Sequence, residues 1–427
     1  MTPPRHLVVV SYFHPPFPSS GGNRWVAMAR HLREAGHRVT FVASDAFGSL
    51  LGDDERSVVR ARDLKSARLL RAALGRGPLP AAGTGAAVER DASGLLTKVL
   101  VPDAHLVSWL PAATLAVRRL VTRGDVDCVV TTGPPDSAHL APLALGTSRP
   151  AWLADFRDGW LFEPLREPFP TGAQRRLDAA LERRVVRSAD AVVAATAPIA
   201  ADLRQRHGVE AATVTNGYDP ALDPDVDMAL LPPFSEDRVL VVHTGALSGP
   251  RGRDATPLLE ALRQVARDPG AGSRLLLVQA GPTSRSDEPL LALLCEEGLV
   301  HALGVVPRPT AVALQRRASA LVLLTSDHVS QTTGKLYEYL AARRPILVLG
   351  SDNEATRIVR ETGTGVVVRH DDVDAIVAAL REIAIGGAER TYAPHGTERY
   401  VYPAPAEAMA ELVEEAIHRR ADARTRA

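Results

Sequence analysis

Short apolar segments alternate with amphipathic ones along most of this chain, and this alternation restricts the possible folds more than any other feature. Leu7 to Ser11 has the continuous apolar character of a buried strand, Gly22 to Ala35 carries helical spacing, and Arg38 to Ala43 is a second apolar run. Strands that alternate with helices form parallel sheets, because each crossover helix returns the chain to the same end of the sheet. We therefore predict an α/β fold.

The same alternation restarts in the second half of the chain. Strands are expected at Val239 to Thr244, Leu275 to Ala280 and Ala320 to Leu324, and a helix at Pro257 to Ala266. A chain of 427 residues is too long for one ordinary core and suits two domains of roughly 200 residues each. The proline-rich stretch 218–236 is unsuited to a sheet. We therefore place a linker there, between domains at 1–217 and 237–405.

Composition excludes several classes of protein. The formal net charge is zero and aromatic residues make up 4% of the chain, so we expect no nucleic-acid partner. Cys128 and Cys295 lie far apart, which argues against a disulfide framework or a cysteine metal site and favours the reduced thiols of the cytoplasm. No stretch approaches 18 apolar residues and no signal peptide is evident, so we expect a cytoplasmic protein. The preference for arginine over lysine, with abundant alanine, is typical of a GC-rich genome and hints at an actinobacterium.

The region from Gly48 to Pro102 departs from the alternation. Basic residues and leucines interleave between residues 60 and 74, which predicts a basic amphipathic helix, and the stretch Gly75 to Ala87, rich in Gly, Pro and Ala, predicts a mobile loop. Such a helix can hold a peripheral enzyme on anionic lipid, although a solvated helix face is the commoner outcome. We expect at most a weak peripheral membrane contact through 60–74.

One lysine has an unusual position. Only three of the 50 basic residues are lysines, and Lys335 is the only one after residue 98. It opens an expected helix that follows the apolar run Ala320 to Leu324 and precedes the apolar run Ile346 to Leu349. Lys335 and Glu338 project from one face of the first helical turn, where free N–H groups and the helix dipole favour an anion. The segment therefore predicts a site for a phosphate-bearing ligand.

This segment has two other interpretations. A P-loop is excluded, because Leu336 follows Gly334-Lys335 where Ser or Thr is needed, and Val329 takes the place of the first glycine. The alternative that stays open is an exposed ion pair between Lys335 and Glu338, worth a few tenths of a kcal/mol.

Glycines follow two of the expected strands. Gly21 and Gly22 end a proline-stiffened loop after the first strand, and Gly245 follows Val239 to Thr244. Glycine lets the backbone approach a ligand closely and offers N–H groups to a phosphate. Arg251, in the second loop, can make a bidentate phosphate contact. The alternatives are a plain strand-to-helix turn and an exposed loop arginine.

Two further strands lead into polar clusters at the carboxyl edge of the first sheet, where ligands of such sheets bind. Asp136 and His139 follow Cys128 to Thr132, and Arg157 with Asp158 follows Trp152 to Asp155. A local salt bridge between Arg157 and Asp158 is the alternative for that pair, and a satisfied core histidine is the alternative for His139.

Two motifs carry a resemblance to a known family. Residues 334–346 read Gly-Lys-Leu-Tyr-Glu-Tyr-Leu-Ala-Ala-Arg-Arg-Pro-Ile, and residues 154–158 read Ala-Asp-Phe-Arg-Asp. They resemble the donor-nucleotide helix and a signature of one subgroup of family-4 glycosyltransferases, which usually has proline where this chain has Gly159. The Gly21-Gly22 loop and the Asn216-Gly217 turn also occupy places where the family has Gly-Gly and Asn-Gly-x-Asp.

The resemblance implies the GT-B fold, in which two Rossmann-like domains face each other across a cleft. The first domain would lie on the acceptor side, the second would bind the nucleotide sugar, and the last helix, within 406–427, would pack back on the first domain. It implies a retaining hexosyltransferase that moves a sugar from a nucleoside-diphosphate sugar to an acceptor hydroxyl, without an enzyme nucleophile. The acceptor would be a secondary metabolite or a cell-envelope glycan, and no metal or other cofactor is expected.

The resemblance also implies residue roles. Lys335 and Arg251 would stabilise the departing diphosphate, Glu338 would orient the ribose, the backbone near Val306 would hold the base, and Asp158 would orient the acceptor; Arg251, Lys335 and Asp158 are the predicted catalytic residues. The predicted donor-binding residues are Gly21, Gly22, Gly245, Arg251, Val306, Thr333, Gly334, Lys335, Leu336 and Glu338. The predicted acceptor-binding residues are Asp136, His139, Arg157 and Asp158.

The chain departs from the family pattern at three places. Ala246 stands where the pattern Gly-Arg-x-x-x-x-Lys-Gly has its arginine. Ser330 stands where the first glutamate of Glu-x7-Glu belongs, with Asp327 as the nearest substitute. Thr132 stands where many relatives have a histidine. Two other functions therefore stay open: a GT-B nucleotide-sugar epimerase, and a non-catalytic nucleotide-sugar-binding protein.

Overall fold

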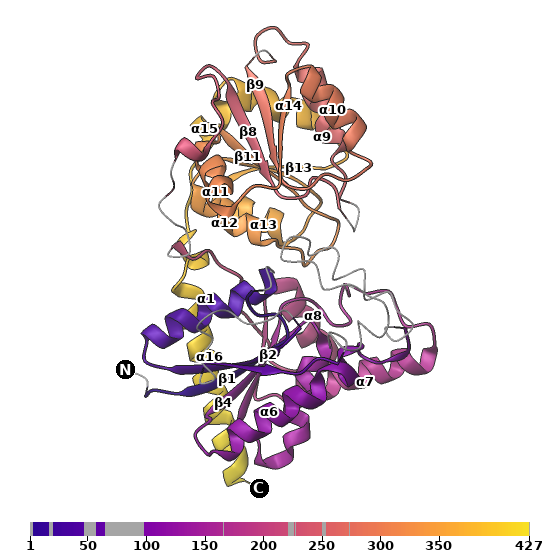
Figure 1. Cartoon of the computed structure of the whole chain (residues 1–427), viewed down its shortest axis with the longest axis vertical. Helices are drawn as coiled ribbons and strands as arrows, with labels where there is room; N and C mark the ends of the chain where they lie inside the picture. Colours follow the sequence, from indigo (N-terminus) through magenta and orange to yellow (C-terminus); the bar gives the residue numbers. More distant parts are fainter. Residues whose placement is uncertain are drawn as a thin grey trace. The chain divides into compact units, whose positions relative to one another are not determined.

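A computed structural model describes residues 3–16, 20–46, 57–64, 98–164, 166–220, 226, 228–249, 253–272 and 274–426. The chain divides into two compact units. Unit 1 comprises residues 1–216 and 402–427, and unit 2 comprises residues 217–401. The predicted α/β fold is confirmed, because each unit is built on a parallel sheet covered by helices on both faces (Figure 1).

Seven parallel strands form one sheet in the described part of unit 1, in the order β3-β2-β1-β4-β5-β6-β7. Their bounds are β1 His6–Ser11, β2 Arg38–Ser44, β3 Val58–Ala61, β4 Cys128–Gly133, β5 Ala151–Phe156, β6 Ala191–Ala194 and β7 Ala212–Thr213. The strands at the centre of the sheet, such as β1, are buried along their whole length. This explains why they read as continuous apolar runs, since both of their faces lie under helices.

The helices of unit 1 pack on both faces of this sheet. Helix α1 (Ser20–Glu34) and the last helix, α16 (Ala404–Thr425), share one hydrophobic cluster on one face. Helices α6 (Leu110–Thr122), α7 (Gly172–Ser188) and α8 (Ala197–His207) cover the other face of the sheet. They pack against the strand residues that alternate with those of the first cluster. The remaining helices in the described part of unit 1 are the short α5 (His105–Ser108) and the 3-10 turns η2 (Asp136–Leu140) and η3 (Pro142–Ser148).

The described part of unit 2 contains a six-stranded parallel sheet in the order β10-β9-β8-β11-β12-β13. Its strands are β8 Val239–Thr244, β9 Leu275–Ala280, β10 Val300–Gly304, β11 Ala320–Leu324, β12 Ile346–Leu349 and β13 Gly365–Val368. Helices α9 (Thr256–Val265), α10 (Glu288–Glu296) and α14 (Val373–Ala384) cover one face. Helices α11 (Arg308–Arg317), α12 (Gly334–Ala342) and α13 (Glu354–Thr362) cover the other. The described part of unit 2 also contains three short helical segments: η5 (Met228–Leu230), α15 (Gly387–Thr391) and η6 (Glu398–Tyr400).

Each sheet reverses its strand order once, between β1 and β4 in unit 1 and between β8 and β11 in unit 2. Loops that leave the carboxyl ends of such a pair diverge to opposite faces and open a crevice, which is where ligands bind in sheets of this kind. The two reversal points are therefore the places to look for a site.

Three sequence-based expectations need correction or lie outside the described residues. Gly21 and Gly22 lie within the first turn of α1 instead of ending the loop before it. Arg60, assigned above to a basic amphipathic helix, lies in strand β3, which pairs with β2; pairing with the sheet overrides the local helical spacing. Residues 65–97 lie outside the described residues, and so does Arg251.

Candidate active site

Helix α12 fills the opening between β8 and β11 in unit 2. The registers paired between these strands are Ala320 with Val241 and Leu321 with Val242. Beyond them, the Tyr339 hydroxyl accepts a hydrogen bond from the Thr244 backbone N–H at 2.9 Å. Burial raises the pKa of Tyr339 to about 12, so its hydroxyl stays neutral. A side chain from the second turn of α12 thus accepts from the last N–H of β8 and holds the helix at the reversal point of the sheet.

Lys335 lies directly over Gly245, the residue that follows β8. A Cβ on Gly245 would be 2.0 Å from Lys335 Nζ and 2.1 Å from its Cε, and the φ of Gly245 is +110°. Glycine suits this position, because side-chain-bearing residues rarely adopt this φ and because a Cβ would displace the ammonium. Helix α12 begins at Gly334, the residue before Lys335, with Thr333 as its N-cap; the Thr333 side chain makes no capping hydrogen bond. The first N–H groups of α12 therefore keep no side-chain partner from their N-cap.

The Lys335 ammonium has no hydrogen bond or ion pair with any residue in the described ranges. Its pKa is lowered to about 8, first by burial and next by the nearby Arg253 cation, while Glu338 acts in the opposite direction. The side chain as a whole is partly exposed. A cation held in this way is poised to receive an anion, which would relieve both unfavourable influences.

Arg253 is the second cation of this site. Its backbone carbonyl accepts from Gly249 N at 3.0 Å, which turns the loop after β8 back on itself. Its guanidinium lies against Gly249, where an added Cβ would be 2.3 Å from one terminal nitrogen. Burial lowers the pKa of Arg253, and no carboxylate among the described residues forms an ion pair with it. The sequence predicted Arg251 for this role, and Arg251 lies outside the described residues. Arg253 was missed, because its place depends on how the loop folds back.

Glu338 lies one turn after Lys335 and is held by two donors. Arg308, the first residue of α11, donates to its Oε1 at 3.0 Å, and Gln315 Nε2 approaches its Oε2 at 3.3 Å. The exposed Lys335–Glu338 ion pair considered above is therefore wrong, because Glu338 is paired with Arg308. Val306, which precedes Arg308, packs against the hydrophobic cluster on the same face of the sheet as α12. Leu336 is fully buried in that cluster.

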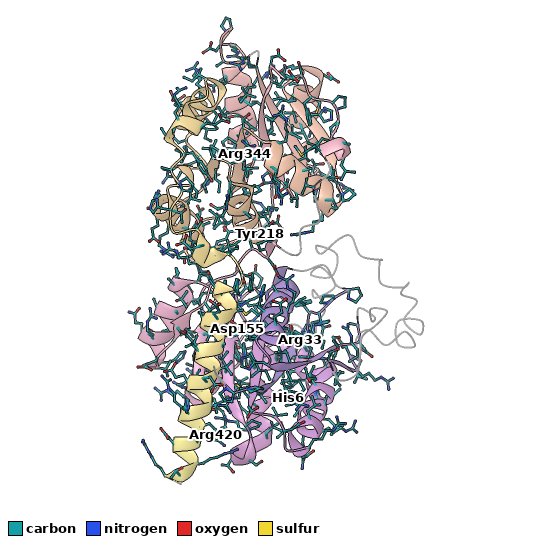
Figure 2. The ribbon with its side chains drawn as sticks, turned by 90° about the vertical axis from the view of Figure 1, so that its left-hand side faces the viewer. His6, Arg33, Asp155, Tyr218, Arg344 and Arg420 are labelled. Atoms are coloured by element: carbon teal, nitrogen blue, oxygen red, sulfur yellow. The ribbon has the colours of Figure 1, made fainter. Side chains whose placement is uncertain are left out.

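At the carboxyl edge of the sheet of unit 1, the buried Asp155, whose place is labelled in Figure 2, is the centre of a hydrogen-bond network. Arg24 approaches both of its oxygens, at 3.1 and 3.3 Å. Trp25 Nε1 donates to Oδ2 at 2.7 Å and the Thr132 hydroxyl donates to it at 3.0 Å. Burial alone would raise the pKa of Asp155, but the Arg24 cation and the hydrogen bonds hold it below its ordinary value. Sequence reasoning missed this role, since Arg24 lies 131 residues away from Asp155.

Arg24 also joins the two points where the chain leaves and re-enters unit 1. It donates to Asn216 Oδ1 at 3.1 Å, and its own carbonyl accepts from the Tyr402 hydroxyl at 3.2 Å. Asn216 is the last residue of the first segment of unit 1, and Tyr402 is the first residue of the second. The first turns of α1, which contain Gly21 and Gly22, are thus tied to both crossing points.

The Arg157 side chain stabilises the loop after β4. It donates to the carbonyls of Gly133 and Pro134 at 2.7 and 2.8 Å. Burial lowers the pKa of Arg157, and the neighbouring Asp158 partly opposes this. Asp136, in the same loop, has a pKa well above its ordinary value, because burial and then the Asp103 carboxylate disfavour its charge. The structure therefore brings Asp136, Arg157 and Asp158 into one electrostatic environment.

His139 has no exposed surface. Its Nδ1 is 2.8 Å from the Thr131 hydroxyl, and its ring stacks on Phe156 with a centroid separation of 4.6 Å. Burial lowers the pKa of His139 to about 4, so the ring is neutral at pH 7. The acceptor contact expected of His139 is not reachable in this conformation, and the side chain packs in the core of unit 1.

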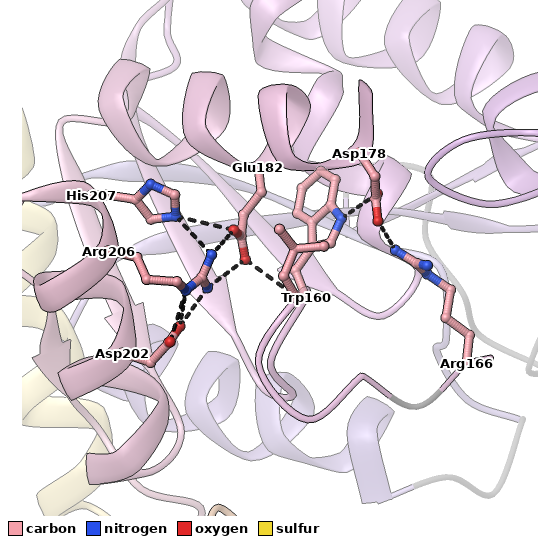
Figure 3. Close-up of polar contacts among 8 residues, drawn as sticks. Trp160, Arg166, Asp178, Glu182, Asp202, Arg206 and His207 are labelled. Carbon is pink, nitrogen blue, oxygen red and sulfur yellow. Dashed lines mark hydrogen bonds and ion pairs between the residues drawn. The ribbon is translucent and has the colours of Figure 1, made fainter. Parts of the chain in front are cut away.

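The loop after Asp158 is anchored to α7 and α8 by buried charges (Figure 3). Trp160 Nε1 donates to Asp178 Oδ1 at 2.8 Å, and Leu161 N donates to Glu182 Oε1 at 3.2 Å. Arg206 and His207 in turn contact the Glu182 carboxylate. The turn itself leaves no room at residue 159, where an added Cβ would be 1.9 Å from Phe162 O. Gly159 is therefore required by this turn, and proline would not fit.

Two family models match the chain, one on each unit. The model described as a glycosyl transferase 4-like domain matches residues 21–217. The model described as glycosyl transferases group 1 matches residues 238–385. Together they span most of the chain. This chain is a glycosyltransferase of the GT-B type.

Solved structures share the fold of this glycosyltransferase at low sequence identity. A sucrose-phosphate synthase from Thermosynechococcus elongatus is 16% identical with a TM-score of 0.64, over 96% of this chain and 98% of that one. An α,α-trehalose 6-phosphate synthase from Burkholderia multivorans is 14% identical with a TM-score of 0.56, over 99% of each chain. A UDP-GlcNAc 2-epimerase from Neisseria meningitidis is 12% identical with a TM-score of 0.55, over 96% of this chain and all of that one. No curated protein matches the sequence.

The predicted donor residues of this glycosyltransferase converge only in part. Gly245, Thr333, Gly334, Lys335 and Glu338 lie together around the start of α12, and the structure adds Arg253 to them. Within the described ranges, no group of three or more His, Cys, Asp or Glu side chains has the arrangement of a metal site. No helix in the same ranges is both long and apolar enough to cross a membrane.

Proposed function

We propose that this glycosyltransferase moves a sugar from a nucleoside-diphosphate sugar to an acceptor hydroxyl, with retention of the anomeric configuration. One observation carries the proposal: the Lys335 ammonium lies over Gly245 and beside Arg253 at the start of α12, with no acidic partner among the described residues. Two adjacent cations at a helix N-terminus favour an anion of high charge density, such as a diphosphate.

The site suits the leaving group of the reaction. As the bond between the sugar C1 and the diphosphate oxygen breaks, negative charge grows on the diphosphate, and charges fixed in advance stabilise it without reorganisation. Lys335 supplies a point charge and Arg253 supplies a bidentate donor. Arg251, outside the described residues, is proposed as a further contact. The backbone N–H group of Gly334, at the start of α12, would add a neutral donor, whereas that of Leu336 already donates to Thr333 O at 3.0 Å.

The nucleoside would lie next to these groups. The Glu338 oxygens are each held by one donor, and a carboxylate oxygen accepts more than one hydrogen bond. We propose that Glu338 accepts from the ribose hydroxyls and that the backbone at Val306 holds the base. Thr333, the N-cap of α12, would contact the diphosphate at the start of that helix. Gly21 and Gly22, in the first turn of α1, are proposed to border the sugar and the diphosphate.

On the acceptor side, we propose that Asp158 orients the acceptor hydroxyl, with Asp136 near it and Arg157 holding the loop. The acceptor oxygen forms its bond to C1 on the face from which the diphosphate departs. The acceptor proton passes to the departing diphosphate oxygen, so no enzyme nucleophile is required. The acceptor class is proposed to be a secondary metabolite or a cell-envelope glycan. Because Lys335 and Arg253 carry the charge stabilisation, the proposed reaction needs no metal ion.

The proposal is tested by a thermal-shift panel of UDP, GDP, dTDP and ADP. A nucleotide at one hundred times its Kd stabilises the native state by about 2.7 kcal/mol, or roughly 5–10 °C for a unit of this size. We expect one nucleotide to stabilise the wild type and not Lys335→Met. Lys98→Met removes an exposed lysine from unit 1 and is the matched control, which should behave as wild type. No shift with any nucleotide would overturn the proposal.

Mass spectrometry of the matching nucleotide sugars then separates transfer from the alternatives. The proposal predicts that the nucleoside diphosphate is released and that its release increases when a suitable acceptor is present. Release of a free epimeric sugar without an acceptor would instead identify an epimerase. Binding without turnover under any acceptor would identify a non-catalytic protein.

A further inference from the structure

His243 is a buried histidine whose two ring nitrogens both face carbonyl oxygens. Its Nδ1 is 2.9 Å from Val322 O, its Nε2 is 3.1 Å from Ala246 O, and 2% of its surface is exposed. A neutral imidazole has one N–H, so it donates to only one of the two carbonyls and turns a lone pair toward the other. Only the imidazolium donates to both. The geometry around His243 therefore fits the protonated ring.

The position of His243 links this geometry to the proposed diphosphate site. The last register paired between β8 and β11 is Val242 with Leu321, and the His243 ring takes the next carbonyl of β11, that of Val322. On its other side the ring contacts the carbonyl of Ala246, the residue after Gly245. The contact at Nε2 thus acts on the turn over which Lys335 lies.

Charged groups reach this region from three elements. Lys335 comes from α12 and Arg253 from the loop after β8, and both act on the ring as cations. Asp287 precedes α10 and reaches the same loop, where the Ser248 hydroxyl donates to it at 2.8 Å. Burial, then Lys335, lower the pKa of His243 to about 4, so the free enzyme at pH 7 holds the neutral ring, which donates to only one of the two carbonyls. Its other ring nitrogen then turns a lone pair toward a carbonyl oxygen, which is unfavourable.

We propose that His243 is a positioning residue that takes up a proton when the donor diphosphate binds, and that it then donates to both Val322 O and Ala246 O. Burial opposes the imidazolium first, and the Lys335 and Arg253 charges add to it. The diphosphate would neutralise these two cations, and its own negative charge would favour the imidazolium. Both hydrogen bonds then hold the Gly245–Ala246 turn against the ligand. This inference rests on the proposed function, because it requires a diphosphate at these cations.

The sign of the pH dependence follows from linkage. Because the ring binds more protons in the complex than in the free enzyme, donor binding strengthens as pH falls. The gain stops near pH 4, where the free ring is itself protonated. The pKa of Lys335 should also rise when the diphosphate binds, but it is already about 8 in the free enzyme. At pH 6 Lys335 is protonated in both states, so proton uptake at pH 6 reports on His243.

The test is calorimetric titration at pH 6 in two buffers that differ in ionisation enthalpy. The probe is UDP-glucose, or GDP-mannose, dTDP-glucose or ADP-glucose if the nucleotide panel selects another base. These diesters have no phosphate group that titrates near neutral pH, so the protons taken up come from the enzyme. We expect an uptake of up to about one proton per bound ligand by the wild type.

Two variants replace the ring by side chains that do not titrate. His243→Gln keeps a donor near the Nε2 position and His243→Asn keeps one near Nδ1, so we expect both to lose the uptake. Loss of one hydrogen bond corresponds to binding weaker by about 2- to 12-fold, with His243→Asn the weaker because it loses the contact to Ala246. His395→Gln removes an exposed histidine of unit 2 and should keep the uptake. Circular dichroism confirms that each variant is folded.

The outcomes separate this inference from the proposed function. Binding by the wild type without proton uptake, or equal uptake by wild type and His243→Gln, would overturn the role of His243 and leave the proposed function intact. Failure of the wild type to bind any of the four nucleotide sugars would overturn both.

Discussion

Replacing Gly245 with alanine tests whether Lys335 lies where the proposed phosphate contact requires it. The new Cβ would be 2.0 Å from Lys335 Nζ, whereas ordinary contacts begin at 3.4 Å, so the ammonium must move by about 1.4 Å. A charge-assisted hydrogen bond does not survive such a shift, because it requires heavy-atom distances of about 2.7–2.9 Å. The loss of one such bond costs about 1.5–3 kcal/mol, which is about 10- to 150-fold in affinity.

The backbone contributes a separate penalty to stability. Gly245 has a φ of +110°, which side-chain-bearing residues rarely adopt, and forcing alanine into it costs about 1–3 kcal/mol of unfolding free energy. Gly298→Ala is the matched control, because Gly298 also has a positive φ, +71°, but nothing lies within 4 Å of an added Cβ. It should lower stability without changing nucleotide affinity.

The assay is calorimetric titration with the nucleotide selected by the thermal-shift panel, together with urea unfolding of each variant. We expect Gly245→Ala to lose both affinity and stability, and Gly298→Ala to lose stability alone. If Gly245→Ala binds the nucleotide as tightly as the wild type, then Lys335 does not contact the phosphate from the position described, and the reasoning is refuted.

Four further outcomes are expected. Lys335→Met should raise the free energy of unfolding at pH 7 and should remove the stability that Lys335 is expected to add to the wild type as pH rises above 8. The reason is that the folded-state pKa of Lys335, about 8, lies below the usual value of 10.5. Urea unfolding at pH 7 and pH 9.5 measures this, and an equal change of stability with pH in wild type and variant would contradict it. Gly159→Ala should lower stability by about 1–3 kcal/mol and reduce turnover while nucleotide affinity is unchanged, because its Cβ would overlap Phe162 O; unchanged thermal unfolding would show that the turn is not tight. Arg24→Met should lower the free energy of unfolding by about 3–5 kcal/mol, because it leaves the buried Asp155 charge without its cation. Adding Asp155→Asn to this variant should restore part of the loss. Urea unfolding of the single and double variants measures both effects, and additive effects in the double variant would refute the pairing. EDTA should leave the rate of donor turnover unchanged, and a loss of activity that added metal restores would disprove the metal-independent mechanism.

The architecture was predictable because strands buried on both faces are continuous apolar runs. Leu7 to Ser11 and Val239 to Thr244 coincide with β1 and β8 almost residue for residue. Helix α12 was predictable for the same reason, since it lies between two such runs and begins beside Lys335, as expected. These features depend on local sequence, which is why sequence reasoning recovered them.

Features set by tertiary contacts were not predictable. Arg60 has helical spacing around it but belongs to β3, because Arg60 pairs with Ala43 of β2 in the sheet. Arg253 joins the described site because the loop turns back at Gly249, whereas Arg251 lies outside the described residues. The role of Asp155 depends on Arg24, which is distant in sequence. No local signal distinguishes such residues from their neighbours.

The central claim is that Lys335 and Arg253 hold one diphosphate, and a double-mutant cycle on nucleotide affinity tests it most directly. Calorimetry with the selected nucleoside diphosphate is carried out on the wild type, Lys335→Met, Arg253→Met and the double variant. Each single substitution should weaken binding by about tenfold or more, and the effects should not add, because neighbouring groups that share a ligand are coupled. Affinities equal to that of the wild type in both single variants would contradict the account, because the diphosphate would then be bound elsewhere.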